Sequence, residues 1–259
     1  MNKPAKSDGT VGKALEILDM VAEAGRPVRF SELLESSDHP KATLYRFLQT
    51  LTNQGMLSYD ADRQTYALGL RLVRLAHSAW QQSSLAPLAR PYLSELAHKA
   101  GETIHLAQME QGQVLFVDKH KTTDRFETLA QAGRVAPAHC TGVGKAILAF
   151  MSADRLERAM KHQTFMQYTP TTHTSQEGVM SEFEDIRRDG VAYDREEHEE
   201  GIISIAAPIL TLSGRVIGAV SIASSTNRNS IETLTAHREA LIETTEKIGA
   251  EASAWQFPS

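Results

Sequence analysis

Cysteine is nearly absent from this chain, since Cys140 is the only one among 259 residues. A single cysteine excludes an intramolecular disulfide and a zinc site built from several cysteines. Long apolar runs are also missing: the longest, GIISIAAPIL, is far shorter than the roughly 20 residues that span a bilayer. The opening residues, MNKPAKSDGT, lack the apolar stretch of a secretory signal. We therefore expect a cytoplasmic protein that makes no contact with a membrane.

Acidic residues are missing between Asp38 and Asp60, although the net charge of the chain is -5. Residues 1–90 carry 11 Lys/Arg against 9 Asp/Glu, whereas residues 91–259 carry 16 against 23. This asymmetry is a small indication that the N-terminal part meets a polyanion. The hydrophobic content of 41% and charged content of 23% are typical of a globular protein. The length allows one large core or two modest ones.

The N-terminal third has the pattern of a winged helix-turn-helix. Apolar residues at helical spacing predict helices over residues 10–25 and 30–38 and a third within residues 38–55, capped by Asp38 or His39. Two alternating runs around Asp-Ala-Asp-Arg predict a hairpin over residues 56–68. In this arrangement the third helix lies in the major groove of DNA. A three-helix bundle with a solvated polar face is the alternative, but the hairpin and the local absence of acid favour DNA binding.

The outward face of this third helix should contact DNA. Lysine and arginine suit phosphates or guanine, and hydroxyl or amide groups reach bases or phosphate oxygens. Arg63, at the tip of the hairpin, is placed to contact the backbone beside the groove. The predicted contacts on the helix are Lys41, Ala42, Thr43, Tyr45, Arg46 and Gln49.

The next helix, from residue 70, carries an apolar stripe of Leu70, Val73, Ala76 and Trp80. Such a stripe packs either on a second copy of the chain or on the C-terminal domain of the same chain. Palindromic DNA sites require two-fold symmetry in the protein, which would give the stripe a use in a dimer. Both alternatives stay open from the sequence.

The C-terminal part alternates strands and helices. Hairpins are predicted over residues 103–120, with a turn at Gln111-Gly112, and over residues 201–225, with a turn at Ser213-Gly214. Single helices are predicted over residues 151–162, 176–190 and 230–255. Antiparallel strand pairs with flanking helices indicate an α+β sensor fold rather than a doubly wound sheet.

The segment HCTGVGKAILAF, residues 139–150, resembles a nucleotide phosphate loop but lacks two of its requirements. The position five residues before the Gly-Lys pair is His139 rather than glycine, and Ala146 rather than Ser or Thr follows the lysine. The free N–H groups of Thr141, Gly142, Val143 and Gly144 at a helix N-terminus would still suit a small anion such as a carboxylate. A plain turn is the alternative interpretation.

Two enzyme-like interpretations are weaker. Cys140, His139 and His198 with acidic neighbours could bind a metal, but no pair has a spacing typical of zinc. Cys140 could be a nucleophile with His139 as its base, yet ten histidines make some such pairing inevitable. The acidic run DGVAYDREEHEEGIIS is expected to be a solvated loop with one member turned inward.

Six segments, taken together, resemble the IclR family of bacterial transcription regulators. They are VGKALEILDMVAEAG, PKATLYRFLQTLTNQGML, YALGLRLVRLA, APAHCTGVGKAILAF, RRDGVAYDREEHEEGIISIAAPI and GRVIGAVSIAS. The resemblance covers nearly the whole chain. It implies a winged helix-turn-helix at residues 8–69, a linker helix at 70–86 and a GAF-like effector-binding domain at 87–256. It also implies dimers that often pair into tetramers, and small organic acids as effectors.

By position, the resemblance implies that the N–H groups of Gly142 and Val143 hold the ligand carboxylate. Side-chain hydrogen bonds would come from Asp194, Ser204 and Ser221, and the walls from Ala136, Thr128 and Ile202. Departures from the family pattern include Ala223 in place of serine, Ser204 in place of cysteine, Thr128 in place of a larger apolar residue, and Arg125 near another apolar position. The pocket should therefore be more polar than usual.

The sequence thus predicts a regulator whose binding to double-stranded operator DNA is modulated by a short 2-oxo or hydroxy acid, glyoxylate- or pyruvate-like, rather than by an aromatic acid. No cofactor, metal or catalytic residue is expected. An enzyme that acts on the same acid through Cys140 and His139 is the alternative. An acidic Asp194 beside a carboxylate requires either a ligand hydroxyl or protonation of the buried side chain.

Overall fold

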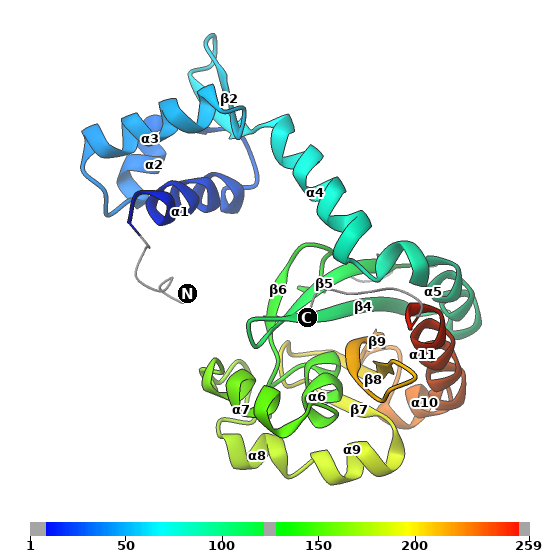
Figure 1. Ribbon diagram of the computed structural model, residues 1–259. Helices are drawn as coiled ribbons and strands as arrows, with labels where there is room; N and C mark the ends of the chain where they lie inside the picture. The colour runs from blue at the N-terminus through cyan, green and yellow to red at the C-terminus, as the bar shows by residue number, and fades with distance from the viewer. Residues whose placement is uncertain (1–8, 122–127, 254–259) are drawn as a thin grey trace. The chain divides into compact units, whose positions relative to one another are not determined.

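The computed structural model describes residues 9–121 and 128–253, except for the side chains of residues 81–83. The chain divides into two compact units, with the boundary between Gln82 and Ser83. Each unit has its own core and is described by itself. The N-terminal unit is the smaller of the two, and each unit contains both helices and strands (Figure 1).

The N-terminal unit is a winged helix-turn-helix. Its elements are α1 (Gly9–Glu23), β1 (Val28–Arg29), α2 (Phe30–Ser36), α3 (Lys41–Asn53), β2 (Leu57–Asp60), β3 (Thr65–Leu68) and α4 (Leu70–Ser83). The strands form an antiparallel sheet in the order β1-β3-β2. The apolar faces of α1, α2 and α3 enclose a core with Ile17, Leu33, Leu44 and Leu48, in which Tyr66 of β3 is also buried. The predicted helix order and hairpin are confirmed.

The helix α4 exposes most of its apolar residues. Leu70 is 85% and Val73 64% exposed, and none of its side chains described in the structure is buried. Exposure of several large apolar side chains on one helix is unfavourable in water unless another surface covers them. The structure therefore leaves this helix available for a partner surface.

The C-terminal unit is built on one antiparallel sheet. Its strands are β4 (Thr103–Glu110), β5 (Gln113–His120), β6 (Val135–Pro137), β7 (Ala192–Arg195), β8 (Ile202–Leu210) and β9 (Val216–Ser225), in the order β6-β5-β4-β9-β8-β7. Both predicted hairpins are present: Gln111 and Gly112 lie in the left-handed region, as does Gly214. The α+β prediction is confirmed.

Helices cover both faces of this sheet. Helix α5 (Ala86–Ala100) and helix α11 (Arg238–Ala252) pack together against one face, and α6 (Gly142–Ala149) packs against the other (Figure 1). Helices α7 (Ala153–Lys161), α8 (Gln176–Met180) and α9 (Phe183–Asp189) lie beyond α6, and α10 (Ile231–Thr235) precedes α11. All eight residues of α6 are buried, so this helix is central to the unit.

Two helices that the sequence pattern predicts as continuous are each divided in two. Residues 176–190 form α8 and α9, which are separated at Ser181 and Glu182. Residues 230–252 form α10 and α11, which are separated at Ala236 and His237. The residues at both breaks keep near-helical dihedral angles. The helical spacing of apolar residues in the sequence also continues through them, so this spacing alone could not reveal a change of direction.

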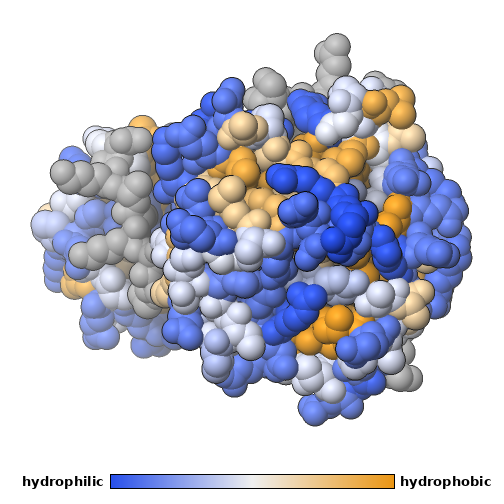
Figure 2. Space-filling view, turned by 90° about the horizontal axis from the view of Figure 1, so that it is seen from below, coloured by the Kyte–Doolittle hydropathy of each residue, from blue (hydrophilic) through white to orange (hydrophobic). Residues whose placement is uncertain are grey.

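None of the helices in the described ranges combines the length and the apolarity needed to cross a bilayer. On the face seen in Figure 2, hydrophilic residues surround the smaller areas where hydrophobic residues reach the surface.

Candidate functional site

Helix α3 has one apolar face in the core and one polar face in solvent. Leu44, Phe47, Leu48 and Leu51 are buried. Five of the predicted DNA-contacting residues on the helix are exposed and the sixth, Thr43, is half-buried; the exposed ones are Lys41, Ala42, Tyr45, Arg46 and Gln49. Since α3 contains no acidic residue, this face offers phosphates and base edges only neutral or cationic groups.

The hairpin beside α3 extends this surface. Arg63 is exposed in the turn between β2 and β3, where the Asp60 carboxylate accepts hydrogen bonds from the backbone N–H groups of Asp62 and Arg63, both at 3.0 Å. A groove of about 780 Å³ runs between the helices and the hairpin. It is lined by Arg29, Phe30, Ser31, Lys41, Ala42, Tyr45, Tyr59, Gln64 and Tyr66. Cationic and tyrosine side chains along one groove suit a phosphodiester backbone.

The C-terminal unit encloses a cavity of about 40 Å³ between α6 and the sheet. Seven of the eight predicted effector-binding residues border it: Thr128, Gly142, Val143, Asp194, Ile202, Ser204 and Ser221. The other lining residues are His105, Phe116, Ala130, Thr141, His198, Glu199 and Ala223. Since roughly 10–15 Å³ is the smallest cavity that holds one water, this volume suits only a small molecule.

Ala136, predicted as a wall of the pocket, does not border the cavity. It is buried on β6, at the edge of the sheet, in the hydrophobic cluster that includes Ala146 and Phe116. Its alanine side chain ends in that cluster before it reaches the cavity, which Phe116 borders instead. Arg125, the other position singled out near the pocket, lies outside the described residues.

Strand register brings the polar lining residues together from distant parts of the chain. Asp194 of β7 is opposite Ser204 of β8, and His105 of β4 is opposite Ser221 of β9. Between β8 and β9, Ser204 is opposite Ala223, and Ser221 is opposite Ala206. Because Ser204 and Ala206 are two residues apart on β8, the two pairs lie in adjacent rows on one face of the sheet. Small side chains in these rows leave space for the cavity.

The N-terminus of α6 lies over this face. Thr141 is the N-cap, and its Oγ1 accepts a hydrogen bond from the Gly144 N–H at 3.3 Å. A Cβ atom on Gly144 would lie 2.3 Å from the Ala138 carbonyl oxygen, so this position requires glycine. A Cβ atom on Gly142 would lie 2.8 Å from Ser204 Oγ and would fit only if that hydroxyl rotated away. The first-turn N–H groups of Gly142 and Val143 and the helix dipole make this end a site for an anion.

Burial determines the protonation states around the cavity. It raises the pKa of Asp194 to about 7, with the Glu197 carboxylate as the second cause. It lowers the pKa of His105 to about 3 and also lowers the pKa of His198. Near neutral pH the two imidazoles are therefore uncharged and Asp194 is protonated in part, so Asp194 repels an entering carboxylate less than a fully ionised aspartate would. Glu199 is the other carboxyl group on the lining.

Replacement of Asp194 by asparagine should change how stability depends on pH. The native pKa near 7 lies above the value of 3.8 for a free aspartate, so between these values the folded state holds a proton that the unfolded state releases. This contribution to the free energy of unfolding decreases as pH rises. The free energy of unfolding of Asp194→Asn, relative to that of wild type, should therefore rise by on the order of 2 kcal/mol from pH 5 to pH 8.

Urea unfolding at both pH values measures this difference. Asp194→Asn keeps the Oδ1 atom that accepts the Glu197 N–H at 2.9 Å, so its fold should be retained. Asp154→Asn, an exposed change on α7, should give equal differences at the two pH values. A pH-independent difference for Asp194→Asn would show that Asp194 is ionised throughout this range.

Lys145, the lysine of the loop-like segment, does not border the cavity but is completely buried behind it. Its Nζ atom donates to the two Glu182 oxygens at 3.0 and 2.9 Å and to Glu197 Oε1 at 2.6 Å. His173 Nε2 contacts Glu182 Oε1 at 2.5 Å. The acidic run is thus less solvated than expected, because both Asp194 and Glu197 are buried.

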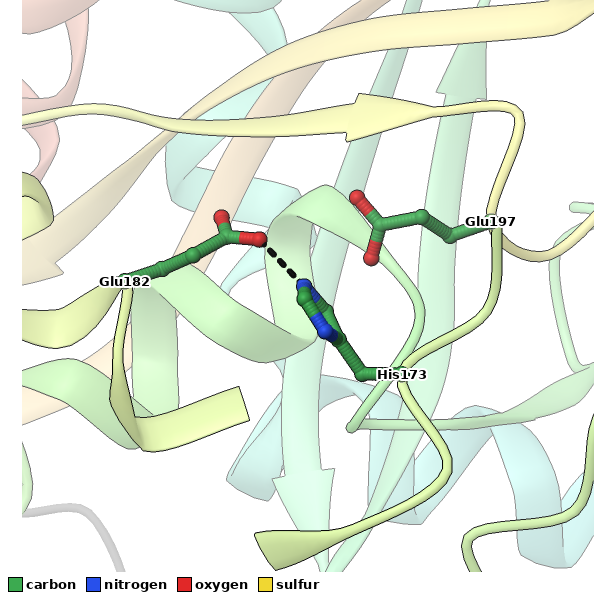
Figure 3. Close-up of side chains that lie close together, drawn as sticks. All are labelled: His173, Glu182 and Glu197. Carbon is green, nitrogen blue, oxygen red and sulfur yellow. Dashed lines mark hydrogen bonds and ion pairs between the residues drawn. The ribbon is translucent and has the colours of Figure 1, made fainter. Parts of the chain in front are cut away.

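The side chains of His173, Glu182 and Glu197 converge as metal ligands would (Figure 3), with ligand atoms within 4.8 Å of one another. The Lys145 ammonium, however, lies within 3.0 Å of both carboxylates and already occupies the position between them with its positive charge. A divalent cation in the same place would be repelled by this ammonium. The cluster is better described as a buried salt bridge that ties α6 to the loop after β7 and to the start of α9.

Cys140 and His139 are not arranged as a catalytic pair. Both side chains are buried, and burial raises the pKa of the Cys140 thiol, with the charges of Asp194 and Glu197 acting in the same direction. His139 Nε2 is 3.2 Å from the Met166 carbonyl oxygen. A buried thiol with a raised pKa is a poor nucleophile, so this geometry does not favour the enzyme alternative.

Both units match known sequence families. Residues 77–250 match the model described as the bacterial transcriptional regulator IclR C-terminal domain, and residues 10–61 match the IclR helix-turn-helix domain. The chain belongs to the IclR family. It is therefore a transcriptional regulator with an N-terminal DNA-binding domain and a C-terminal effector-binding domain, as the resemblance implied.

The similarity to other IclR-family members extends over whole chains. The regulator KdgR of Escherichia coli is 30% identical over 258 residues, which cover 100% of this chain and 98% of KdgR. XynR of E. coli is 28% identical over 90% of this chain and 92% of its own. The crystal structure of the Thermotoga maritima IclR has a TM-score of 0.76 at 26% identity, covering 94% of this chain and 98% of that one.

Local sequence patterns did not indicate several of the residues that line the cavity of this IclR-family chain. His105 and Phe116 lie in a strand pair that reads only as alternating core positions, and Glu199 lies in the acidic run. The one available signal for His105 was a histidine between the apolar residues Ile104 and Leu106. Lys145 was noticed as part of a motif, but no local pattern indicates its partners, which lie 37 and 52 residues away.

Proposed function

We propose that this protein binds operator DNA through α3 and the hairpin, and that a short 2-oxo or hydroxy acid in the C-terminal cavity modulates this binding. The observation that carries the proposal is the small cavity at the N-terminus of α6, where two backbone N–H groups meet Asp194, Ser204 and Ser221. Few backbone N–H groups at this helix end are left to bind a ligand, and the cavity has a volume of about 40 Å³. Both observations favour a ligand that has one carboxylate and few other atoms.

In this proposal the carboxylate binds the N–H groups of Gly142 and Val143, at the positive end of the helix. Asp194, protonated or paired with a ligand hydroxyl, and Ser204 donate or accept from the sheet side. Thr128 and Ile202 contact the remaining carbon atoms. No resident cofactor or metal is required for this binding.

Control of DNA binding requires that the ligand prefer one of two arrangements of the protein. A differential affinity of about 1–3 kcal/mol per site would change operator occupancy substantially. We propose that the protein acts as a dimer, or as a pair of dimers, with Leu70 and Val73 of α4 covered by a second copy. Two copies would then place two α3 helices on a palindromic site.

A DNA retardation assay with the region upstream of its own gene, titrated with glyoxylate, pyruvate and 4-hydroxybenzoate, tests the proposal. 4-Hydroxybenzoate is the ligand in the crystal structure of an IclR homologue from Microbacterium hydrocarbonoxydans, which has the same fold with a TM-score of 0.79 at 22% identity. We expect the small acids to shift the DNA-bound fraction several-fold and the aromatic acid to have no effect.

Gly142→Ala is the matched control, because its added Cβ would displace the Ser204 hydroxyl and fill the anion end of the cavity, with no further atoms to disturb the fold. This variant should bind DNA as wild type does but no longer respond to acid. A response only to the aromatic acid would overturn the ligand class. Failure to bind DNA at low salt would overturn the assignment of α3 as the DNA-contacting helix.

A further inference from the structure

His105 has an incompletely satisfied side chain at the cavity. The residue lies on the central strand β4, is 2% exposed and borders the cavity. Its Nδ1 atom is 3.4 Å from Ser221 Oγ, whereas its Nε2 atom is buried and has no hydrogen-bond partner among the described residues. A buried polar atom without a partner is unfavourable, and native proteins usually satisfy it with water or a ligand.

The surroundings determine what the Nε2 atom can do. Burial, followed by the charge of Lys119, lowers the pKa of His105, while the Ala130 carbonyl acts in the opposite direction. That carbonyl already accepts hydrogen bonds from Lys119 Nζ at 2.9 Å and Thr128 Oγ1 at 3.2 Å. The imidazole is therefore neutral, and when the Ser221 hydroxyl donates to Nδ1, the proton resides on Nε2. The Ala130 carbonyl is near enough to affect the pKa of His105, but Nε2 makes no hydrogen bond of normal geometry to it, so this donor is at most weakly satisfied by the protein.

The position of His105 in the sheet places this donor away from the anion end of the cavity. The N-terminus of α6 lies over Ser204 of β8, and β9 separates β8 from β4. With about 4.8 Å between neighbouring strands and about 6.8 Å between adjacent rows along a strand, the backbones of Ser204 and His105 are roughly 12 Å apart. A carboxylate held by Gly142 and Val143 is thus bound from one side, and His105 approaches the ligand from the other.

We infer that His105 donates an Nε2 hydrogen bond to the oxo or hydroxyl oxygen of the effector and so selects oxo and hydroxy acids over acids without this oxygen. The inference rests on the proposed function, because it assumes that a carboxylate occupies the end of the cavity at α6. It adds a specificity-determining residue on the far side. A site that hydrogen-bonds a ligand oxygen discriminates strongly against the analogue that lacks it, since the donor is then left buried and unpaired.

The experiment compares two acids with equal numbers of carbon atoms. Calorimetry should show that wild type binds pyruvate at least tenfold more tightly than propionate. In His105→Leu this ratio should fall to about one, with propionate affinity nearly unchanged, and His105→Gln should recover part of the preference through its amide N–H. His98→Leu, an exposed change on α5, should keep the wild-type ratio.

A measurement on the unsubstituted protein accompanies the variants. With 15N-labelled histidine, pyruvate but not propionate should shift the Nε2 resonance of His105, and the ring should remain a neutral Nε2–H tautomer. If both acids bind and His105→Leu keeps the preference for pyruvate, the inference is wrong while the proposed function stands. If neither acid binds wild type, the proposed ligand class fails and the inference fails with it.

Discussion

Lys145→Met should lower the free energy of unfolding by about 3–5 kcal/mol, the cost typical of removing one partner from a buried salt bridge. The side chain is completely buried, and its ammonium is the shared donor to Glu182 and Glu197. Methionine fills nearly the same volume, so the loss would be electrostatic rather than a cavity effect. Urea denaturation monitored by circular dichroism measures it.

The reason for so large an effect is the pair of acids that would remain. Burial alone would raise the pKa of Glu182, but the charge and hydrogen bond of Lys145, with those of His173, outweigh it and lower this pKa. Glu197 is nearly inaccessible, and its Oε2 atom already has no partner among the described residues. Without the ammonium, two carboxylates would face each other inside the protein, and at least one would take up a proton.

Two control variants distinguish this explanation from simple loss of packing. Lys145→Met combined with Glu197→Gln should recover part of the stability, because it removes one of the opposed carboxylates. Lys161→Met disrupts an exposed pair with Glu157 on α7 and should cost less than about 1 kcal/mol. An unchanged stability in Lys145→Met would mean that the two acids are protonated in the native protein.

The sequence predicted most of the secondary structure because local periodicity and turn residues specify it. The buried stripe of Leu44, Phe47, Leu48 and Leu51 on α3 follows directly from helical spacing. Gln111 and Gly112 marked a hairpin turn that requires positive φ at both positions. The divisions at Ser181–Glu182 and Ala236–His237 were missed because the local pattern does not change there.

The site was predictable only where a resemblance supplied positions. Asp194 and Ser204, or His105 and Ser221, become neighbours through strand register, which depends on the whole sheet and not on any local spacing. The N-terminus of α6 was recognisable from its glycines. Whether Lys145 would turn towards the ligand or away from it depends on Glu182 and Glu197, and no local feature of residues 139–150 indicates these partners.

Replacing both Lys41 and Arg46 by alanine should weaken operator binding by on the order of 2–4 kcal/mol, or about 30- to 1,000-fold. Both side chains are exposed on α3, beside the buried stripe that fixes the orientation of the helix. Arg46 lies near the Phe47 ring, with its guanidinium carbon 5.3 Å from the ring centroid, which limits its freedom. Neither change removes core packing, so the fold should be unaffected.

Fluorescence anisotropy with labelled operator DNA over a series of salt concentrations measures this loss. Each lost phosphate contact should reduce the slope of log K against log salt by about one. Lys161→Ala with Lys247→Ala removes the same charge from exposed positions of the C-terminal unit and should leave both affinity and slope unchanged. If this control weakens binding as much as the α3 variant does, either DNA contacts the C-terminal unit or the affinity depends only on the net charge of the protein. In both cases α3 would not be the element that recognises the operator.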